Sequence, residues 1–238
     1  MGLDLYVGSL TRYYIGEWET IVQKYAKQEG LKLDMVRPES EPDAITDPDE
    51  VIEIVDAWML GLGKGLESHL PKDTEFYWQD DMSKPYFTDK PTWDCYGSML
   101  LWAAYSEHPE FSKPTDYIDK WNEDPAFQAS VSEGFKTKYG QLLHDTELWL
   151  PVEFQFSFKT EDPTGNKVGI GSCFELFRQL KILNEASWCA DQKQISLWRK
   201  EGADYQSPLE IGARFSFSAF YELCKDAVIN KLPMKLDY

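Results

Sequence analysis

A cysteine at position 173 follows two closely spaced glycines, in the stretch Gly169-Ile-Gly171-Ser-Cys173. The pattern predicts a strand that runs through small residues into the N-terminus of a helix. Backbone N–H groups at such a terminus bind anions and lower the pKa of a nearby thiol. Cys173 is therefore a candidate nucleophile, although the GxSxG motif of a nucleophile elbow is absent. The structural alternative, which we favour, makes Ser172 the helix N-cap, Cys173 a small core residue and the glycines a tight exit from a hairpin.

Four aspartates lie among aromatic residues between positions 76 and 94, and they are Asp80, Asp81, Asp89 and Asp94. Such carboxylates can bind Ca²⁺ or Mg²⁺, or form a pair for acid–base chemistry, but the DxDxDG pattern of an EF-hand loop is missing. Aromatic rings beside carboxylates also occur in carbohydrate sites. The alternative is an acidic loop with packed rings and no site. The segment has no regular period, so we expect a long loop or short irregular strands.

The histidines and cysteines show no spacing that is typical of a metal site. The three histidines, His69, His108 and His144, lie near the ends of predicted helices, and HExxH is absent. The four cysteines are far apart and form no CxxC pair. We therefore predict reduced thiols in a cytoplasmic protein, with no disulfide framework, no metal site and no cofactor.

The net charge of −17 is unevenly distributed along the 238 residues. Residues 1–150 carry 29 acidic and 13 basic side chains, whereas residues 151–238 carry 12 and 11. Nucleic acids and anionic membranes both require a positive face, so the charge argues against them as partners. No apolar run approaches the roughly 20 residues of a membrane span. A basic protein, a cation, or a gain in solubility alone remains compatible with this charge.

The acidic excess peaks at residues 39–56, which contain no basic residue. Asp47-Pro48 predicts a helix start, with an N-cap and a proline at the first position. Apolar residues at helical spacing predict a buried stripe, so Asp49, Glu53 and Asp56 should lie together on the outer face. Like charges at this spacing repel by a few tenths of a kcal/mol per pair. This face is either a solvated surface or a docking face for a basic partner.

The N-terminus predicts the strand around which the sheet forms. Leu3, Leu5 and Val7 alternate with other residues, which is the period of a strand with one face in a core. From Glu17 the apolar spacing changes to that of a helix, which should end before Gly30 and cover the sheet. A second strand is predicted over residues 31–36.

The rest of the chain predicts a mixture of helices and hairpins, and residues 185–214 stay ambiguous. The expected elements are a helix from Thr92 to about Ser106, a helix from Asp124-Pro125 to near His144, a strand over Val152–Phe158, a turn over 160–167, a returning strand over 168–171, a helix after Ser172, a last helix from Ser216 or Ser218, and an edge strand at Met234–Tyr238.

The opening MGLDLYVGSLTRYY followed by GEWETIVQ resembles the start of a group of uncharacterised bacterial proteins. The segment from Tyr86 to Asp94 and the helix predicted after it are similar to the same group. The resemblance implies a bacterial, cytoplasmic origin. It carries no known activity and transfers no catalytic residue.

These patterns together predict one α+β domain over residues 1–238, with a mixed sheet and several covering helices. An acidic, helix-richer part spans residues 1–150 and a near-neutral hairpin-plus-helix part spans 151–238. The function we favour is a non-catalytic, acidic protein-binding module, for instance an immunity or antitoxin-like protein that masks a basic partner. The alternative is a small hydrolase or transferase that uses Cys173 or the carboxylates of residues 80–94. The oligomeric state stays open.

Overall fold

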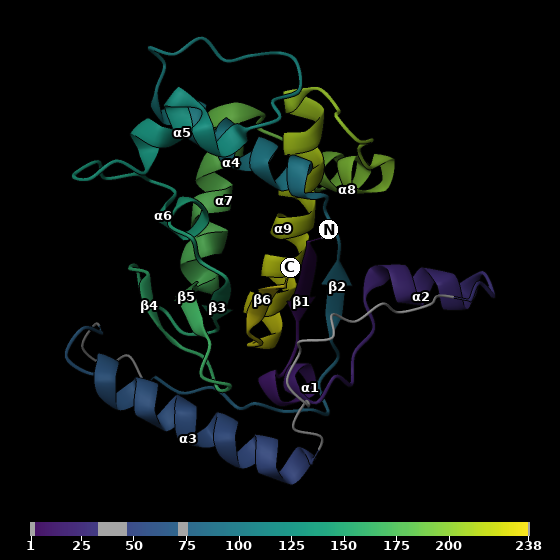
Figure 1. The fold of residues 1–238 in the computed structure, drawn as a ribbon, viewed down its shortest axis with the longest axis vertical. Coiled ribbons are helices and arrows are strands. Elements are labelled where there is room, and N and C mark those ends of the chain that lie inside the picture. Colours follow the sequence, from purple (N-terminus) through teal and green to yellow (C-terminus); the bar gives the residue numbers. More distant parts are fainter. Residues whose placement is uncertain (1–2, 33–46, 71–75, 238) are drawn as a thin grey trace.

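A computed structural model describes residues 3–32, 47–70 and 76–237. Within these residues, one mixed sheet has the strand order β2-β1-β6-β3-β5-β4. Its strands are β1 (Asp4–Val7), β2 (Phe87–Asp89), β3 (Leu148–Leu150), β4 (Phe158–Glu161), β5 (Lys167–Ser172) and β6 (Met234–Asp237). β3 and β5 are parallel and the other pairs are antiparallel. Helices pack on both faces (Figure 1), so the predicted α+β class with a mixed sheet is confirmed.

The first strand is interior, as its apolar alternation predicts. β1 pairs with β2 on one side and with β6 on the other. Leu3, Leu5 and Val7 face one core, and Tyr6 is fully buried against the opposite face. The prediction of an edge strand at the C-terminus is wrong, because β6 lies between β1 and β3. A short strand of alternating residues looks the same at an edge and in the interior until its partners are known.

One face of the sheet carries a helical layer. It consists of α4 (Trp93–Glu107), α7 (Cys173–Ser187), α8 (Gln192–Glu201) and α9 (Leu209–Asn230). Thr92 accepts a hydrogen bond from Cys95 N–H, and Ser172 accepts one from Glu175 N–H. Both residues are therefore N-caps, as predicted. The last helix begins seven residues before the predicted Ser216, because its apolar side continues back to Leu209 and Pro208 can precede a first helical turn.

The other face is covered by α3 (Pro48–Leu66), which lies apart from the helical layer at the bottom of Figure 1. Asp47 is its N-cap, as predicted, and accepts a hydrogen bond from Asp49 N–H at 3.0 Å. Val51, Val55 and Met59 are buried. The short helix α1 (Leu10–Tyr14) contributes Leu10 to the same core.

The helix predicted to cover the sheet near the N-terminus does not do so. α2 (Ile21–Gln28) has a complete capping box between Thr20 and Gln23, but it projects from the body (Figure 1). Ile21, Val22 and Tyr25 are exposed and only Ala26 is buried. The helical period was predicted correctly, but a period does not state which surface the apolar side meets. The strand expected at 31–36 lies mostly outside the described residues.

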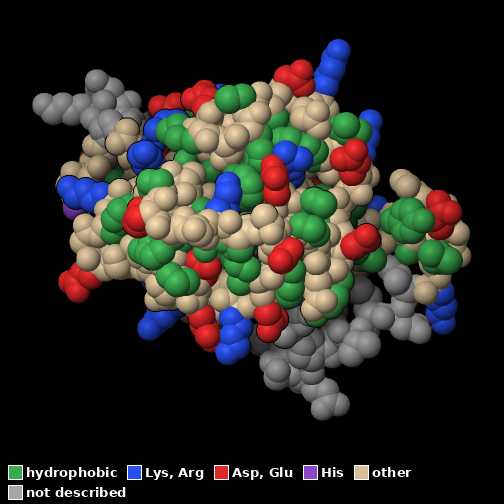
Figure 2. All heavy atoms as spheres, turned by 90° about the horizontal axis from the view of Figure 1, so that it is seen from above, with side chains coloured by type: hydrophobic (Ala, Val, Ile, Leu, Met, Phe, Trp, Pro, Cys, Tyr) green, Lys and Arg blue, Asp and Glu red, His purple; other side chains and the backbone are tan. Residues whose placement is uncertain are grey.

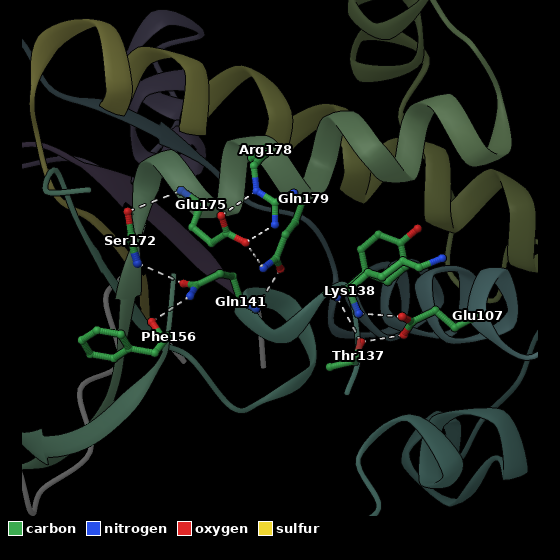
Figure 3. Close-up of polar contacts among 10 residues, drawn as sticks. Glu107, Thr137, Lys138, Gln141, Phe156, Ser172, Glu175, Arg178 and Gln179 are labelled. Atoms are coloured by element: carbon green, nitrogen blue, oxygen red, sulfur yellow. Dashed lines mark hydrogen bonds and ion pairs between the residues drawn. The ribbon is translucent and has the colours of Figure 1, made fainter. Parts of the chain in front are cut away.

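A single long helix after Asp124 is not formed. Asp124 caps α5 (Pro125–Ser130) as predicted, through Ala126 N–H at 2.8 Å, and α6 (Gly140–Leu143) is separate. Gly134 between them has φ +86°, a left-handed conformation that ends helices. Glu107 of α4 then holds the segment by accepting hydrogen bonds from the Thr137 hydroxyl and Lys138 N–H, both at 2.6 Å (Figure 3). The 3-10 turn η1 (Trp121–Glu123) precedes α5.

The strand predicted over Val152–Phe158 is also not formed, since only its last residue belongs to β4. Buried side chains donate hydrogen bonds to backbone carbonyl groups of this segment, which in a sheet would accept from a neighbouring strand. Ser172 Oγ donates to Val152 O at 2.6 Å, and Gln141 Nε2 donates to Phe156 O at 3.0 Å. The predicted turn and return strand are present as the β4–β5 hairpin. An irregular segment with alternating phenylalanines therefore replaces the strand.

Candidate functional site

Cys173 lies at the N-terminus of α7, where the sequence places it, but deep in the core. Its side chain is fully buried, and the thiol donates to Trp149 O at 3.1 Å. Burial raises the pKa of the Cys173 thiol, whereas the nucleophile hypothesis requires a lowered pKa. The hypothesis of an activated Cys173 thiol is therefore wrong. The structural alternative that we favoured is confirmed for Ser172, which is the N-cap of α7, and for Cys173, which is a core residue. Cys173 is therefore not suited to be the nucleophile of the hydrolase or transferase hypothesis.

The surroundings of Ser172 form a buried polar network that the sequence did not indicate. Gln141 Oε1 accepts the hydrogen bond of Ser172 N–H at 3.0 Å, and Gln179 Oε1 accepts that of Gln141 N–H at 2.8 Å (Figure 3). Gln179 Nε2 donates to Glu175 Oε1 at 2.7 Å. Gln141, Gln179 and Glu175 are all buried. Every one of these contacts joins protein groups to each other, as expected of a structural network.

An arginine at the surface, Arg178, donates further hydrogen bonds to the Glu175 carboxylate. Arg178 donates to Glu175 Oε2 through Nε at 2.7 Å and to Oε1 through Nη2 at 2.5 Å. The Glu175 carboxylate thus accepts from both Arg178 and Gln179, and it lies in the first turn of α7, where the helix dipole already favours it. At this terminus Ser172 Oγ accepts the hydrogen bond of Glu175 N–H, and the Glu175 carboxylate supplies negative charge of the sign that the helix dipole favours.

Asp80 caps a helix and Asp81 stabilises a turn. Asp80 accepts hydrogen bonds from the backbone N–H groups of Leu10 at 2.6 Å and Thr11 at 2.8 Å, so its carboxylate binds the start of α1. Asp81 Oδ1 accepts from Ser83 N–H at 2.8 Å, and hydrogen bonds from Ser83 lower the pKa of Asp81. The two neighbouring carboxylates therefore stabilise different stretches of backbone.

Asp89 and Asp94 are engaged elsewhere. Asp89, at the end of β2, forms an ion pair with Arg199 Nε at 2.7 Å, and Arg199 also pairs with Glu222 at 2.6 Å. Burial raises the pKa of Glu222, but hydrogen bonds from Ser196 and Arg199 outweigh it, so this pKa lies below its ordinary value. Asp94 lies in the first turn of α4. The four aspartates thus do not converge on one site.

We expect the change Asp80→Asn to lower the free energy of unfolding by about 2 kcal/mol. An amide offers one acceptor where the carboxylate offers two, and hydrogen bonds to a charged group contribute about 1.5–3 kcal/mol. Urea unfolding followed by circular dichroism measures the change. The neighbouring change Asp81→Asn is the control, since asparagine keeps the oxygen that accepts from Ser83. Equal stability of Asp80→Asn and the parent protein would contradict a capping role.

The outer face of α3 is defined here by Asp49, Ile52, Glu53, Asp56 and Leu60. The sequence singled out its three carboxylates and assigned Ile52 to the buried stripe, but the structure leaves Ile52 exposed on this face. Its three carboxylates are exposed, and among the described residues none pairs with a lysine or arginine. Ile52 and Leu60 are 40% and 62% exposed. The face thus combines negative charge with two apolar contacts.

The inner side of α3 holds this face in a defined position. Val51, Val55 and Met59 are buried, and Trp58 Nε1 donates to Glu161 O of the edge strand β4 at 2.8 Å. A different part of the surface is seen from above in Figure 2, where acidic, basic and hydrophobic side chains are interspersed. The face seen there therefore differs from the outer face of α3, where the charged side chains are all acidic.

Other candidate chemistry is sparse in the described part of the chain. There, no three His, Cys, Asp or Glu side chains gather as metal ligands. Likewise, none of the helices in residues 3–32, 47–70 and 76–237 has both the length and the apolar character needed to cross a bilayer. Comparison of the chain with family models, with curated proteins and with solved structures finds no match.

Proposed function

We propose that this chain is a non-catalytic protein-binding module whose partner docks on the outer face of α3 and is basic. The observation that supports the proposal is the set of exposed carboxylates, Asp49, Glu53 and Asp56, on a helix anchored through its opposite side. They lie three and four residues apart, where like charges repel. A cationic surface relieves that repulsion when it binds.

The exposed apolar side chains of Ile52 and Leu60 can form the apolar centre of such an interface. Binding energy in protein interfaces concentrates in a few desolvated apolar contacts, and charges around them chiefly raise the association rate. Ile52 and Leu60 lie on the same side of α3 as the carboxylates, by helix geometry. A partner surface with lysines or arginines around an apolar patch is complementary to this face.

The proposal extends to the setting in which the protein acts. We propose a cytoplasmic protein of bacterial origin, of the immunity or antitoxin-like kind, which masks a basic partner. The net charge of −17 supports a protein partner over a nucleic acid, because phosphates would be repelled.

Changing Asp49→Asn, Glu53→Gln and Asp56→Asn together should slow capture of the partner about tenfold at low salt. Steering by charge raises association rates by about 10- to 1,000-fold, and screening over a Debye length of about 8 Å removes most of this at physiological salt. The partner is first recovered by native pull-down, and surface plasmon resonance then measures its association rate at two salt concentrations. The free triple variant should be as stable as the parent or slightly more stable.

The matched control removes the same charge elsewhere, by Asp116→Asn, Glu133→Gln and Asp204→Asn, three exposed positions away from α3. It should change the association rate by less than about twofold, because these charges lie outside α3 and the Coulomb attraction of a charge for the partner weakens with its distance from the contact. If both triple variants bind equally fast at low salt, α3 is not the docking face.

A further inference from the structure

A small pocket opens on the opposite side of the sheet from α3, where α4, η1 and α5 meet the loop before β3. Its volume is about 100 Å³. The walls combine aromatic rings and leucines with a threonine and two acidic residues. Its lining consists of Trp93, Tyr96, Leu100, Trp121, Phe127, Leu142, Leu143, Asp145, Thr146, Glu147 and Leu236. Among the described residues, no lysine or arginine lines it.

Three aromatic rings form one corner of this pocket. The ring centroids of Trp93 and Tyr96 are 5.8 Å apart, those of Trp93 and Trp121 are 5.8 Å apart, and those of Tyr96 and Trp121 are 6.3 Å apart. The planes are inclined to each other by 44°, 55° and 84°, and all three residues line the pocket. Such corners of aromatic faces bind organic cations through the ring quadrupole.

The corner is preorganised by its neighbours. Trp121 lies against Gly97 so closely that a Cβ at that position would approach the indole to 2.2 Å. The ring of Tyr96 stacks on Phe220 with a centroid distance of 5.6 Å. Two of the three rings are thus fixed from behind, which reduces the entropy that a ligand loses on binding.

The loop before β3 lines another side of the pocket with two carboxylates and with a hydroxyl that has no hydrogen-bond partner in the described part of the chain. Thr146 is 1% exposed, lines the pocket, and its Oγ1 has no hydrogen-bond partner among the described residues. A buried hydroxyl without a partner costs free energy, and a ligand that donates to it removes that cost. Asp145 and Glu147 flank it in the chain. Lys159 pairs with Asp145 at 2.7 Å on the exposed side and neutralises part of this charge.

We propose that this pocket binds an alkylammonium group, supplied either by a small amine or by a lysine side chain of a protein partner. The rings attract the cation, the acidic residues stabilise it, and Thr146 Oγ1 accepts an N–H hydrogen bond. A cavity of about 150 Å³ accommodates benzene, so 100 Å³ accommodates a group of four or five heavy atoms. An anion is disfavoured by the two carboxylates, and a sugar ring needs more room and more donors.

The experiment is an NMR titration that follows the indole N–H signals of Trp93 and Trp121 in ¹⁵N-labelled protein. The probes are n-butylammonium and tetramethylammonium chloride, lysine blocked at both backbone ends, and n-pentanol as the neutral equivalent. We expect n-butylammonium to shift both signals with a dissociation constant of roughly 1 mM. Blocked lysine that binds better than n-butylammonium identifies a protein source, and weaker binding identifies a small amine.

Two single changes test the chemistry with opposite signs. Glu147→Gln should weaken n-butylammonium binding about fivefold or more, because it removes a charge beside a partly desolvated cation. Lys159→Met should strengthen binding about twofold, because it leaves Asp145 without its counter-ion, and Lys159 is exposed enough that folding is retained. The indole signal of Trp58, on the far side of the sheet, is the internal control.

The result that would overturn the proposal is equal binding of n-pentanol and n-butylammonium, which would make the pocket merely apolar. Unchanged Trp93 and Trp121 signals up to 50-fold above the expected dissociation constant would also overturn it. The test does not use the outer face of α3, so its outcome is independent of the proposed function.

Discussion

Iodoacetamide should alkylate Cys189 in the folded protein at least about a thousand times faster than Cys173. Cys189 is exposed at the end of α7, whereas Cys95, Cys173 and Cys224 are buried. A buried thiol reacts only when the protein opens, and a stability of about 5–15 kcal/mol keeps the open fraction below about one in a thousand. Burial also raises the pKa of Cys173, so little thiolate is present in the closed protein.

Mass spectrometry of the four cysteine peptides over time measures these rates. In concentrated urea the four peptides should be labelled at rates within a few-fold of each other, which controls for intrinsic reactivity. Native labelling of Cys173 as fast as that of Cys189 would contradict the buried position and restore the nucleophile hypothesis.

The change Gly169→Ala should lower the free energy of unfolding by about 3 kcal/mol or more. A Cβ at this position would lie 2.0 Å from the backbone oxygen of Asp145 and 3.1 Å from Cα of Thr146. The atoms with which this Cβ would clash belong to the backbone, which cannot move away by a change of rotamer as a side chain can. Asp145 itself has φ +55°, and Glu147 N–H donates to Gly169 O at 2.9 Å, so the loop is held against β5. Overpacking of a fixed core typically costs about 1–3 kcal/mol and sometimes more.

The matched control is Gly61→Ala, a glycine inside α3 where an added Cβ would meet no atom within 4 Å. Alanine there should raise the free energy of unfolding by about 0.5–1 kcal/mol, because glycine is unfavourable in a helix interior. Urea unfolding of both variants gives the comparison. Equal stability of Gly169→Ala and Gly61→Ala would show that the loop yields, and that the close approach to β5 is not required by the fold.

The elements that the sequence predicted well depend on contacts between residues close in the chain. Asp47, Thr92, Asp124 and Ser172 cap helices by accepting hydrogen bonds from N–H groups two or three residues away. The alternation in β1 and the turn before β5 are equally local. Each follows from side-chain chemistry and backbone geometry over one turn, which is why a single sequence reveals it.

The errors concern surfaces that meet residues far away in the chain. The apolar side of α2 has the right period, yet it meets no described core. Val152–Phe158 alternates as a strand does, but Ser172 and Gln141 take its carbonyl groups. β6 is interior because β1 and β3, from distant parts of the chain, lie on both sides of it. Periodicity describes one element, whereas pairing and packing depend on two.

The candidate sites divide in the same way. The grouping of Asp49, Glu53 and Asp56 on the outside of α3 was predicted, because their spacing and helix geometry alone place them together. The role of Asp80 was not predicted, because its carboxylate accepts hydrogen bonds from backbone N–H groups about seventy residues earlier in the chain. The pocket beside Thr146 likewise joins α4, η1, α5, α6, the loop before β3, and β6. Local spacing therefore determined what lies on one helix, and only the tertiary structure decided which carboxylates, rings and thiols are buried together, because long-range packing brings them into contact.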